Sequence, residues 1–498
     1  MSAPVGTCCI VLHTHLPWLA HHGAWPVGEE WLHQSWASSY LPVVELLERL
    51  VGEGRRDLLT LGVSPVLAAQ LDDPYCLREF HTWLGFWQVR AEGLAGSGPG
   101  SDEFRRATGA LAAFERSWRH GASPLLRRLT DAGAVEVLGG PATHPFQPLL
   151  DDRVARFALR TGLDDAVLRT GTRPEGIWAP ECGYRPGLED LYAAEGVRRF
   201  VVDGPNLLRA GRSTADAWTV GSSDVVAFAR DLDVTYRVWS PKKGYPSGAW
   251  YRDFHTYDHD SGLRPARVTS TRTAPHEKAP YDPQRGRAAA QADAADFVSV
   301  VRRRLLDLAG ARDGRPALVT VAFDTELFGH WWHEGPAFLE QVLRLLPEAG
   351  VNVTTLRGAV EAGHVGGAVD LGEGSWGSGK DWRVWAGEQV ADLVDNGARV
   401  QKQLLDLVDA ELGAWPRRSS RRADLDQLAR DALLTLASDW AFMVTKDSAA
   451  HYARNRAAGH LADFTALARA VEAGHGGELA TRQRATDGPF AQLDARLL

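Results

Sequence analysis

Short apolar runs rich in β-branched residues recur along the chain up to residue 356, and amphipathic helical patterns separate several of them. Continuous apolar runs are typical of strands that are covered on both faces, as in a parallel sheet. The repeated alternation of strand and helix predicts a β/α barrel or a large doubly wound sheet. The runs are CCIVL (8–12), LLTLG (58–62), VEVLG (135–139), GIWAP (176–180), RFVVD (199–203), VVAFA (225–229), ALVTVAFD (317–324) and VNVTTL (351–356).

Two segments interrupt this alternation. Residues from about 74 to 125 carry long helical patterns with no strand between them, which predicts a helical insertion. From about Gly387 the pattern is helical throughout, which predicts a C-terminal helical domain. We therefore expect a strand–helix domain at 1–370 and a helical domain at 371–498. A polar stretch from about Arg252 to Arg287 is expected to form a long loop over the functional site.

The composition excludes several classes of protein. A net charge of −8 argues against a nucleic-acid-binding surface, which needs a basic excess. No apolar stretch is long enough to span a membrane, and the N-terminal run is too short for a signal peptide. The four cysteines lack the spacing of a zinc or redox site and are too few for a disulfide scaffold, which favours a reducing compartment. We expect a cytoplasmic protein.

Polar and ionisable residues gather where the predicted strands end. HTHLPW, GGPATHP, ECGY and DTELFGHWW each follow an apolar run. Barrels and open α/β sheets place their functional sites at the carboxyl ends of their strands. The segment FDTELFGHWW, from Phe323 to Trp332, is therefore expected to form one wall of an active-site mouth.

Two acidic residues stand out at these strand ends. Glu181 follows GIWAP, and Asp324 ends the run ALVTVAFD. A buried carboxylate costs several kcal/mol unless it is paired or hydrogen-bonded, so such positions need an explanation. Two carboxylates at one barrel mouth suit glycoside chemistry, in which one attacks or activates water and the other protonates the leaving oxygen. Their environments must differ so that only one holds a proton near neutral pH.

Histidines supply a third group of candidates. His13 and His15 lie two residues apart and so face the same side of an extended chain. The pair is suited to a zinc site completed by Asp324 or Asp203, and equally to hydrogen bonds with sugar hydroxyls. His144 adds another donor. Since no cysteine ligand or helical His-x-x-x-His pair accompanies them, we favour sugar binding over metal.

Tryptophan is unusually frequent, with 18 residues. Many lie beside acids, histidines, glycine or proline, where a flat aromatic face is suited to the C–H face of a sugar ring. These are Trp18, Trp25, Trp31, Trp178, Trp239, Trp331, Trp332, Trp376 and Trp385.

Five segments together resemble, in order, the motif regions of glycoside hydrolase family 57, and most closely its actinobacterial, mycobacterial-type 1,4-α-glucan branching enzymes. They are HTHLPWLAHHGAWPVGEEW, VEVLGGPATHPFQPLL, GIWAPECGY, FDTELFGHWWHEG and GSWGSGKDWRVW. The helical tail with ASDWAFMVTKDSAAHYA is similar to the C-terminal domain of that subgroup. The resemblance spans nearly the whole chain. It implies an α/β fold, an incomplete (β/α)7 barrel with a helical insertion and a C-terminal all-helical domain.

The resemblance also implies a retaining mechanism without metal or other cofactor. Glu181 corresponds to the nucleophile and Asp324 to the general acid/base, with Glu326 as a rival for the acid role. His13 and His144 would bind the sugar at the cleavage point, and Asp439 would brace or contact the site. The remaining expected sugar contacts are His15, Trp25, Trp31, Trp331, Trp376 and Trp385. The resemblance implies a catalytic barrel at 1–370 and a C-terminal domain at 371–498 that contributes the aromatic residues Trp376 and Trp385 to the site. The implied partners are α-1,4-glucan donor and acceptor chains, and the oligomeric state stays open.

The sequence departs from the family pattern at two places. Branching enzymes of this type carry a tyrosine on a flexible loop, but the corresponding stretch from Asp203 to Phe228 has no tyrosine, and Trp218 is its only aromatic residue before Phe228. A usual Tyr-Trp pair is replaced by Pro265 and Ala266. An α-amylase-like hydrolase, a 4-α-glucanotransferase and action on a modified, methylated glucan therefore stay open. A metal-dependent carbohydrate deacetylase or hydrolase and a silent glucan-binding protein are further alternatives.

Overall fold

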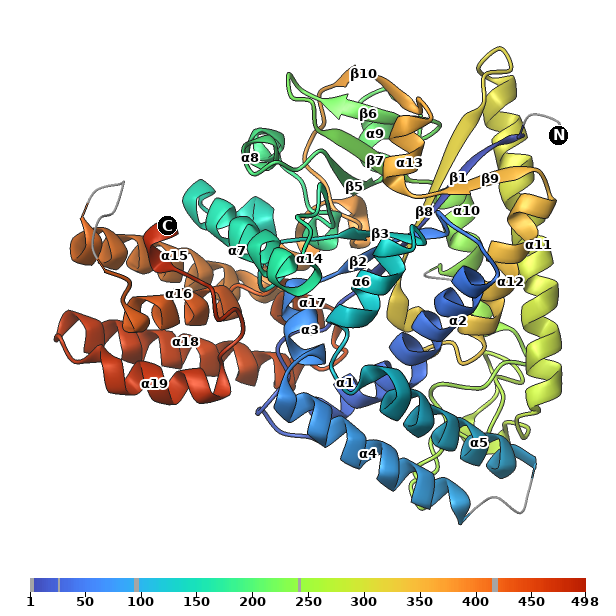
Figure 1. Cartoon of the computed structure of the whole chain (residues 1–498), viewed down its shortest axis with the longest axis horizontal. Coiled ribbons are helices and arrows are strands. Elements are labelled where there is room, and N and C mark those ends of the chain that lie inside the picture. Colours follow the sequence, from blue (N-terminus) through green and yellow to red (C-terminus); the bar gives the residue numbers. More distant parts are fainter. Residues whose placement is uncertain (1–3, 26, 94–97, 241–242, 414–419) are drawn as a thin grey trace.

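A nearly closed parallel barrel forms the centre of the molecule in the computed structural model, which describes residues 4–25, 27–93, 98–240, 243–413 and 420–498. Seven strands follow one another around it (Figure 1): β1 (Gly6–Thr14), β2 (Leu59–Val63), β3 (Val135–Leu138), β4 (Gly176–Ile177), β5 (Arg199–Asp203), β7 (Val226–Arg230) and β8 (Ala317–Asp324). The Gly139–Ile177 bridge joins the β3 and β4 sides, and the Arg230–Thr320 pair joins β7 to β8, so the ladders at these two junctions are short among the described residues. The predicted incomplete (β/α)7 barrel is confirmed.

The central strands β1 and β8 determine where the site lies. Every residue of β1 is buried, and β8 is buried up to its last residue. Their parallel register sets Gly6 beside Ala317 and His13 beside Asp324. Because parallel strands end at the same edge of a sheet, the polar residues after both strands reach one mouth of the barrel.

Three further strands lie outside the barrel. β9 (Val351–Thr354) pairs with the first half of β1, and β10 (Val365–Val369) pairs with β6 (Ala217–Val220), which runs antiparallel to β7. All eight predicted apolar runs contain strands. Strands β6 and β10 were not predicted, because they are short and their residues, AWTV and VGGAV, do not form a continuous aliphatic run.

Helices cover the barrel, and their ends follow local sequence signals. Asp282 accepts hydrogen bonds from the backbone N–H groups of Gln284 and Arg285 and so caps the long helix α11 (Pro283–Gly310), which has proline in its first turn. The other covering helices are α1 (Glu29–Ser35), α2 (Leu41–Gly52), α3 (Pro65–Leu71), α6 (Ser123–Asp131), α7 (Asp152–Thr170), α8 (Leu188–Ala194), α9 (Gly204–Arg209), α10 (Leu232–Val238), α12 (Gly335–Glu348) and α13 (Leu356–Glu361).

The predicted helical insertion consists of α4 (Pro74–Glu92), α5 (Gly98–Ala113) and a short π-helical turn, Phe114–Trp118. Figure 1 shows α4 and α5 side by side on one flank of the molecule. Phe80 of α4 stacks on Trp36, with ring centroids 4.3 Å apart, and this contact fastens the insertion to the barrel.

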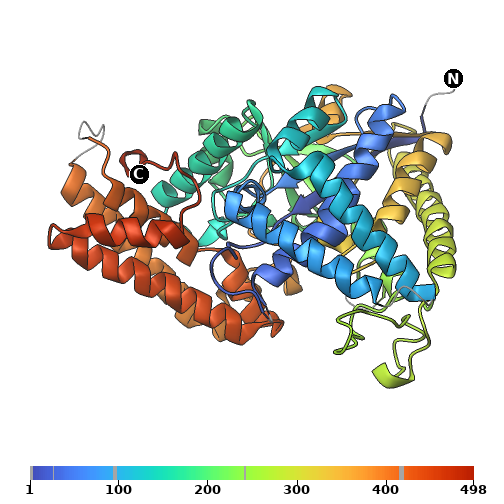
Figure 2. The ribbon, with the colours of Figure 1, turned by 60° about the horizontal axis from the view of Figure 1, so that its bottom comes forward.

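The C-terminal region is helical, as predicted. It contains α14 (Arg383–Ala386), α15 (Ala391–Leu412), α16 (Ala423–Thr435), α17 (Ser438–Lys446), α18 (Ala450–Glu472) and α19 (Gly476–Thr486). Both ribbon views place α15, α16, α18 and α19 together beside the barrel (Figures 1 and 2). The backbone N–H of Ser438 donates to the carbonyl of His144 at 3.1 Å, so α17 begins at the barrel mouth. None of the described helices is long and apolar enough to cross a membrane.

Candidate active site

Glu181 lies in a strained turn directly after β4. Its φ is 62° and that of Cys182 is 49°, both in the left-handed region. Such residues cost of order 1–3 kcal/mol each and persist where the surroundings enforce them. The carboxylate accepts a hydrogen bond from Trp376 Nε1 at 2.8 Å and one from the Ser438 hydroxyl at 2.8 Å. The side chain is therefore held in one orientation.

Burial raises the pKa of Glu181 to about 7. The hydrogen bonds from Trp376 and Ser438 oppose this shift because they stabilise the ionised form, whereas the nearby charge of Asp439 adds to it. The carboxylate thus titrates close to neutral pH.

Asp324 ends β8 and is half-buried. Burial raises its pKa to about 6, against the opposing charges of Arg230 and His15. No side chain or backbone group of the described residues donates a hydrogen bond to its carboxylate, so both oxygens are available to a ligand.

Glu326, two residues further along, has a different environment. It is 2% exposed, and its Oε1 accepts from the Tyr40 hydroxyl at 2.5 Å and from the His15 backbone N–H at 3.3 Å. Burial and the neighbouring charge of Asp324 raise its pKa to about 8. Glu326 is therefore tied to the protein, in contrast to Asp324.

Three histidines form a stack across the mouth. The ring centroids of His15 and His144 are 3.7 Å apart and those of His13 and His144 are 5.0 Å apart, while His13 also stacks on Trp178 at 4.4 Å. His15 is hydrogen-bonded to Ser64 through Nδ1 at 2.7 Å and to Asp439 through Nε2 at 3.0 Å. The stack links strands β1 and β3 to the C-terminal helices.

The three rings differ in their protonation. Burial lowers the pKa of His13 and of His144 well below the ordinary range, so both are neutral at pH 7. Burial also acts on His15, but the charge and hydrogen bond of Asp439 outweigh it and raise the pKa of that ring. His13 Nδ1 and His144 Nε2 are buried and have no hydrogen-bond partner among the described residues.

This stack connects the two predicted catalytic carboxylates. Asp324 is the register neighbour of His13, and His144 Nδ1 is 4.0 Å from Glu181 Oε1. The charge of His15 also acts on both Glu181 and Asp324. The structure therefore brings Glu181, Asp324, His13, His15, His144 and Asp439 together at one site.

The predicted tryptophans fall into different places. Trp376 touches Glu181, and Trp331 is half-buried and stacks on Trp239 at 6.1 Å. Trp31 is half-buried against the cluster formed by Ala437, Trp440 and their neighbours, whereas Trp25 is 65% exposed.

Trp385 requires a correction. It is 1% exposed, because Phe146 stacks on its ring at 4.8 Å and Gly377 lies so close that an added Cβ would be 2.7 Å from Trp385 Cζ3. Because its surface is covered in this way, the indole cannot serve as the stacking platform for a sugar ring that was predicted from the sequence.

Several residues of the site were not singled out from the sequence. Ser438 precedes the predicted Asp439 and is the first residue of α17. Its position at the start of a helix was the signal available for it in the sequence. Below Trp376, Arg230 donates to Asp203 at 2.8 Å, Lys380 pairs with Asp203 at 2.7 Å, and the guanidinium lies 5.2 Å from the Trp376 ring centroid. Arg230 ends strand β7, as the candidate ligand Asp203 ends β5, and this position at a strand end was the signal available for Arg230.

Comparison with known protein families shows to which family the chain belongs. The model of "Glycosyl hydrolase family 57" matches residues 9–368, and that of "1,4-alpha-glucan branching enzyme, C-terminal" matches residues 398–498. The chain belongs to glycosyl hydrolase family 57.

Individual family members agree with this assignment. A probable 1,4-alpha-glucan branching enzyme of Mycobacterium tuberculosis is 53% identical over 524 residues, covering 100% of this chain and 99% of that protein. A 1,4-alpha-glucan branching enzyme of Thermococcus kodakarensis is 33% identical, covering 93% of this chain and 73% of that protein.

Solved structures agree as well. The crystal structure of a family 57 branching enzyme from T. kodakaraensis, in complex with glucose, matches with a TM-score of 0.93 at 30% identity, covering 99% of this chain and 96% of that one. A family 57-type branching enzyme from Pyrococcus horikoshii matches with a TM-score of 0.91 at 30% identity, with the same coverage. An α-amylase from Thermotoga maritima shares the fold, with a TM-score of 0.87 at 24% identity.

One group at this family 57 site is also suited to a metal ion. One ligand atom each of His15, His144 and Asp439 lies within 4.8 Å of the others. Two histidines and one carboxylate are a ligand set that zinc accepts. In the present arrangement, however, His15 uses both ring nitrogens in hydrogen bonds to Ser64 and Asp439, and His144 Nδ1 is bonded to Ser438.

Proposed function

We propose that the protein is a 1,4-α-glucan branching enzyme, which cleaves α-1,4 bonds and forms α-1,6 branches. The observation that carries this proposal is the pair Glu181 and Asp324 at one barrel mouth, in a chain that resembles branching enzymes over its full length. Its donor and acceptor chains are α-1,4-glucans, with a glycogen-like polymer as product.

In this proposal Glu181 is the nucleophile. Its carboxylate attacks the anomeric carbon while Asp324 donates a proton to the departing glycosidic oxygen, so a covalent glycosyl–enzyme ester forms. The Trp376 and Ser438 donors orient the attacking carboxylate. Asp324, now ionised, takes the proton of an acceptor 6-hydroxyl, whose oxygen displaces Glu181. Two displacements at the same carbon retain its configuration.

We assign the acid/base role to Asp324 rather than Glu326. A group that gives and then takes a proton must reach the substrate oxygen, and Asp324 has free carboxylate oxygens at the strand end. Glu326 is buried and already accepts from Tyr40 and His15. Its structural role is to hold those two groups in place.

His13 and His144 are proposed to bind the sugar at the cleavage point. Each is neutral and has one buried ring nitrogen without a partner among the described residues. An unpaired buried polar atom costs about 1–3 kcal/mol, and a sugar hydroxyl would satisfy it. We assign Trp376 and Trp331 to sugar stacking because both are half-buried, Trp376 against Glu181 and Trp331 on the loop that follows Asp324.

Transfer requires that water be kept from the glycosyl–enzyme. The stretch from Asp203 to Phe228, which lacks the usual tyrosine, is packed as α9, β6 and the start of β7. Its Trp218 donates to the Ser213 carbonyl at 2.9 Å and lies under Arg212, so it is no lid. We propose that the stacked pair Trp239 and Trp331 excludes water instead.

The test uses the two carboxylates. Wild-type protein is expected to lower the iodine staining of amylose and to create α-1,6 linkages visible by NMR, with few new reducing ends. Glu181→Gln should lower kcat by roughly 10⁴-fold or more, and Asp324→Asn by about 10²- to 10⁴-fold.

A Glu92→Gln variant, which changes an exposed residue at the end of helix α4, is the matched control and should retain full activity. If the wild-type protein produced new reducing ends without branches, the protein would be a hydrolase and the proposal would be wrong. If it redistributed the chain lengths of amylose without forming branches, the protein would be a 4-α-glucanotransferase.

The metal-capable group His15, His144 and Asp439 favours one second candidate, a metal-dependent carbohydrate hydrolase or deacetylase. It predicts stoichiometric zinc in the purified protein and activity lost to chelators. Branch formation that persists in the presence of EDTA would rule against this candidate. The cytoplasmic location expected from the sequence stays a prediction.

A further inference from the structure

Three charged side chains form a buried cluster beneath Trp376. Asp203 and Arg230 end the parallel strands β5 and β7 and are register partners. Arg230 Nε donates to Asp203 Oδ1 at 2.8 Å, and Lys380 Nζ lies 2.7 Å from Asp203 Oδ2, as an ion pair without the alignment of a hydrogen bond. Asp203 is fully buried, and Arg230 is 7% exposed. A single buried carboxylate therefore holds two cations.

Such a cluster is a costly feature for a fold to keep. Removing charges from water carries a penalty that the attraction between them need not repay, and apolar side chains of similar volume are often as stable. The zinc-ligand role considered for Asp203 does not explain the cluster, because Arg230 and Lys380 engage both carboxylate oxygens. A contribution to the adjacent site explains it better than a contribution to stability.

The two cations hold Trp376 at different points. The guanidinium carbon of Arg230 lies 5.2 Å from the centroid of the Trp376 ring, within the range of a cation–π contact. Lys380 Nζ donates to the Trp376 carbonyl at 3.0 Å. Trp178 adds an edge-to-face contact, with ring centroids 5.0 Å apart. Both the ring and the main chain of Trp376 are thus fixed by neighbouring side chains.

Trp376 in turn holds the proposed nucleophile. Its backbone N–H donates to the Glu181 carbonyl at 2.9 Å, and its Nε1 donates to Glu181 Oε2 at 2.8 Å. The first bond supports a residue in the left-handed region of backbone space, which needs such support. The second bond fixes the direction of the carboxylate. One residue therefore controls both the backbone and the side chain of Glu181.

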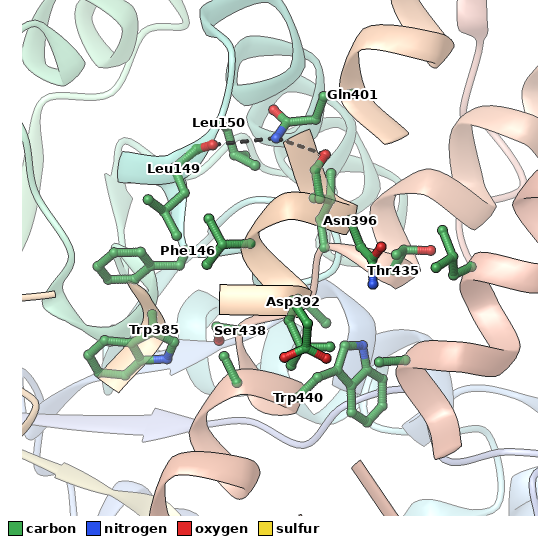
Figure 3. A pocket seen from close by; sticks show the side chains of 18 of the residues that line it. Phe146, Leu149, Leu150, Trp385, Asp392, Asn396, Gln401, Thr435, Ser438 and Trp440 are labelled. Carbon is green, nitrogen blue, oxygen red and sulfur yellow. Dashed lines mark hydrogen bonds between the residues drawn. The ribbon is translucent and has the colours of Figure 1, made fainter. Parts of the chain in front are cut away.

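The other hydrogen bond to the Glu181 carboxylate has a different setting. The Ser438 hydroxyl donates to Oε1 at 2.8 Å, and Ser438 borders a cavity of about 270 Å³. Phe146, Trp385 and helices α15, α17 and α18 line that cavity (Figure 3). Trp376, by contrast, has the charged cluster directly beneath it. We therefore expect the position of the carboxylate to depend more on Trp376 than on Ser438.

Arg230 has a second connection to the reaction. Its charge opposes the rise in the pKa of Asp324 that burial causes. It therefore favours the ionised form of the proposed acid/base, which takes the proton of the acceptor in the second step. The same side chain thus acts on Asp324 by its charge and on Glu181 through Trp376.

We propose that Arg230, Asp203 and Lys380 are positioning residues, which hold Trp376 so that Glu181 points at the anomeric carbon. The inference rests on the proposed function. None of the three needs to touch the glucan in this role. A nucleophile that is misplaced by about 1 Å loses up to about 100-fold in rate, so the cluster affects the chemical step more than substrate binding.

The test uses the full-length protein and amylose. Arg230→Met removes the charge beneath Trp376 and leaves Asp203 paired with Lys380. Lys380→Met removes the partly exposed cation and leaves the Arg230–Asp203 pair intact. In each variant kcat for branching should fall by roughly 10- to 100-fold, while KM for amylose should stay within about twofold. Arg230→Lys, which keeps a cation under the ring, should recover most of the loss.

A structural measurement checks the same proposal without activity. In crystals of Arg230→Met and of Lys380→Met, the distance between Trp376 Nε1 and Glu181 Oε2 should lengthen beyond that of a hydrogen bond. Arg302→Met, which changes an exposed arginine of α11, is the matched control and should keep both kcat and this distance.

A Trp376–Glu181 hydrogen bond that stays intact in both variants would overturn the proposal. A loss in kcat that Arg230→Lys does not recover would also overturn it, since the cluster would then act only through packing. If the wild-type protein hydrolysed amylose without branching, the proposed function would be wrong, and kcat for hydrolysis in the same variants would still test the cluster. Branching at the wild-type rate in both variants would contradict the positioning role alone.

Discussion

At the scale of single residues, the notable feature is that both proposed catalytic carboxylates titrate near neutral pH. Burial raises the pKa of Glu181 to about 7 and that of Asp324 to about 6. The proposed first step needs Glu181 ionised and Asp324 protonated. Since the group that must lose its proton has the higher pKa, only a fraction of molecules hold both in the working form, and this fraction is largest between about pH 6 and 7.

Ser438→Ala tests this electrostatic description. The lost hydrogen bond stabilised the ionised form of Glu181, so its removal should raise that pKa further, by about one unit. The working fraction should then fall about tenfold at pH 6 but only about twofold at pH 8, and the alkaline limb of kcat/KM should move to higher pH. A pH profile of branching on amylose provides the measurement.

The matched control is Ser448→Ala, an exposed serine just past the end of the same helix, which should leave the profile unchanged. A loss of activity of equal size at every pH would mean that Ser438 acts by packing, without effect on the proton equilibrium of Glu181.

At the scale of elements, the short helix α14 shows how neighbouring segments determine the role of a side chain. Its Trp385 lies between Phe146 from the loop after β3 and the backbone at Gly377. The tight approach to Gly377 leaves no room for a Cβ. The indole is therefore held in one orientation between these two segments.

Gly377→Ala should disturb this packing. The new methyl group would be 2.7 Å from Trp385 Cζ3 and 2.9 Å from Cη2. Overpacking of this kind costs typically about 1–3 kcal/mol, so the free energy of unfolding should fall by that amount in urea titrations.

Gly372→Ala is the matched control, because nothing lies within 4 Å of its added Cβ. Equal urea midpoints for the two variants would show that Trp385 is free to move, which would contradict the locked orientation.

At the scale of the whole molecule, the barrel and the C-terminal helices form one functional unit. Ser438 and Asp439 of the C-terminal region lie at the barrel mouth, where they bind Glu181 and His15. Conversely, His22 in the loop after β1 contacts the C-terminal region, where its imidazole donates to Asp487 at 2.7 Å. We propose the boundary between the two domains at residues 370 and 371, but neither part contains the whole site.

Asp487→Asn tests how strongly the two parts stabilise each other. Although burial alone would raise it, the pKa of Asp487 is lowered, chiefly by the hydrogen bond from His22 and by the charge of His460. A lowered pKa stabilises the fold above the ordinary value of about 3.9, and this contribution disappears as the pH falls through the lowered pKa. The variant should cost about 1.5–3 kcal/mol at pH 7, measured by urea unfolding, and progressively less below about pH 4.

Asp395→Asn, on the exposed face of α15, is the matched control and should not change the free energy of unfolding at pH 7 or in acid. A cost for Asp487→Asn that stays the same in acid would mean that the charge of Asp487 does not contribute to the contact between the two parts.

The local pattern of the chain predicted much of this fold and site. The eight apolar runs became strands because a strand that is covered on both faces requires only a local run of apolar residues, and the acids at the ends of these strands were expected at the mouth because parallel strands end at one edge. Glu181 and Asp324 were found in this way, as were the histidines of the stack.

Only the tertiary structure decided which distant residues complete the site. Ser438 reaches Glu181 across 257 positions, the Arg230–Asp203–Lys380 group lies beneath Trp376, and Trp385 is covered where an open platform was expected. Sequence by itself determined the elements and the acids at their ends, because periodicity and strand ends are local properties. The partners of those acids depend on how the helices pack against the barrel, and no local pattern encodes that packing.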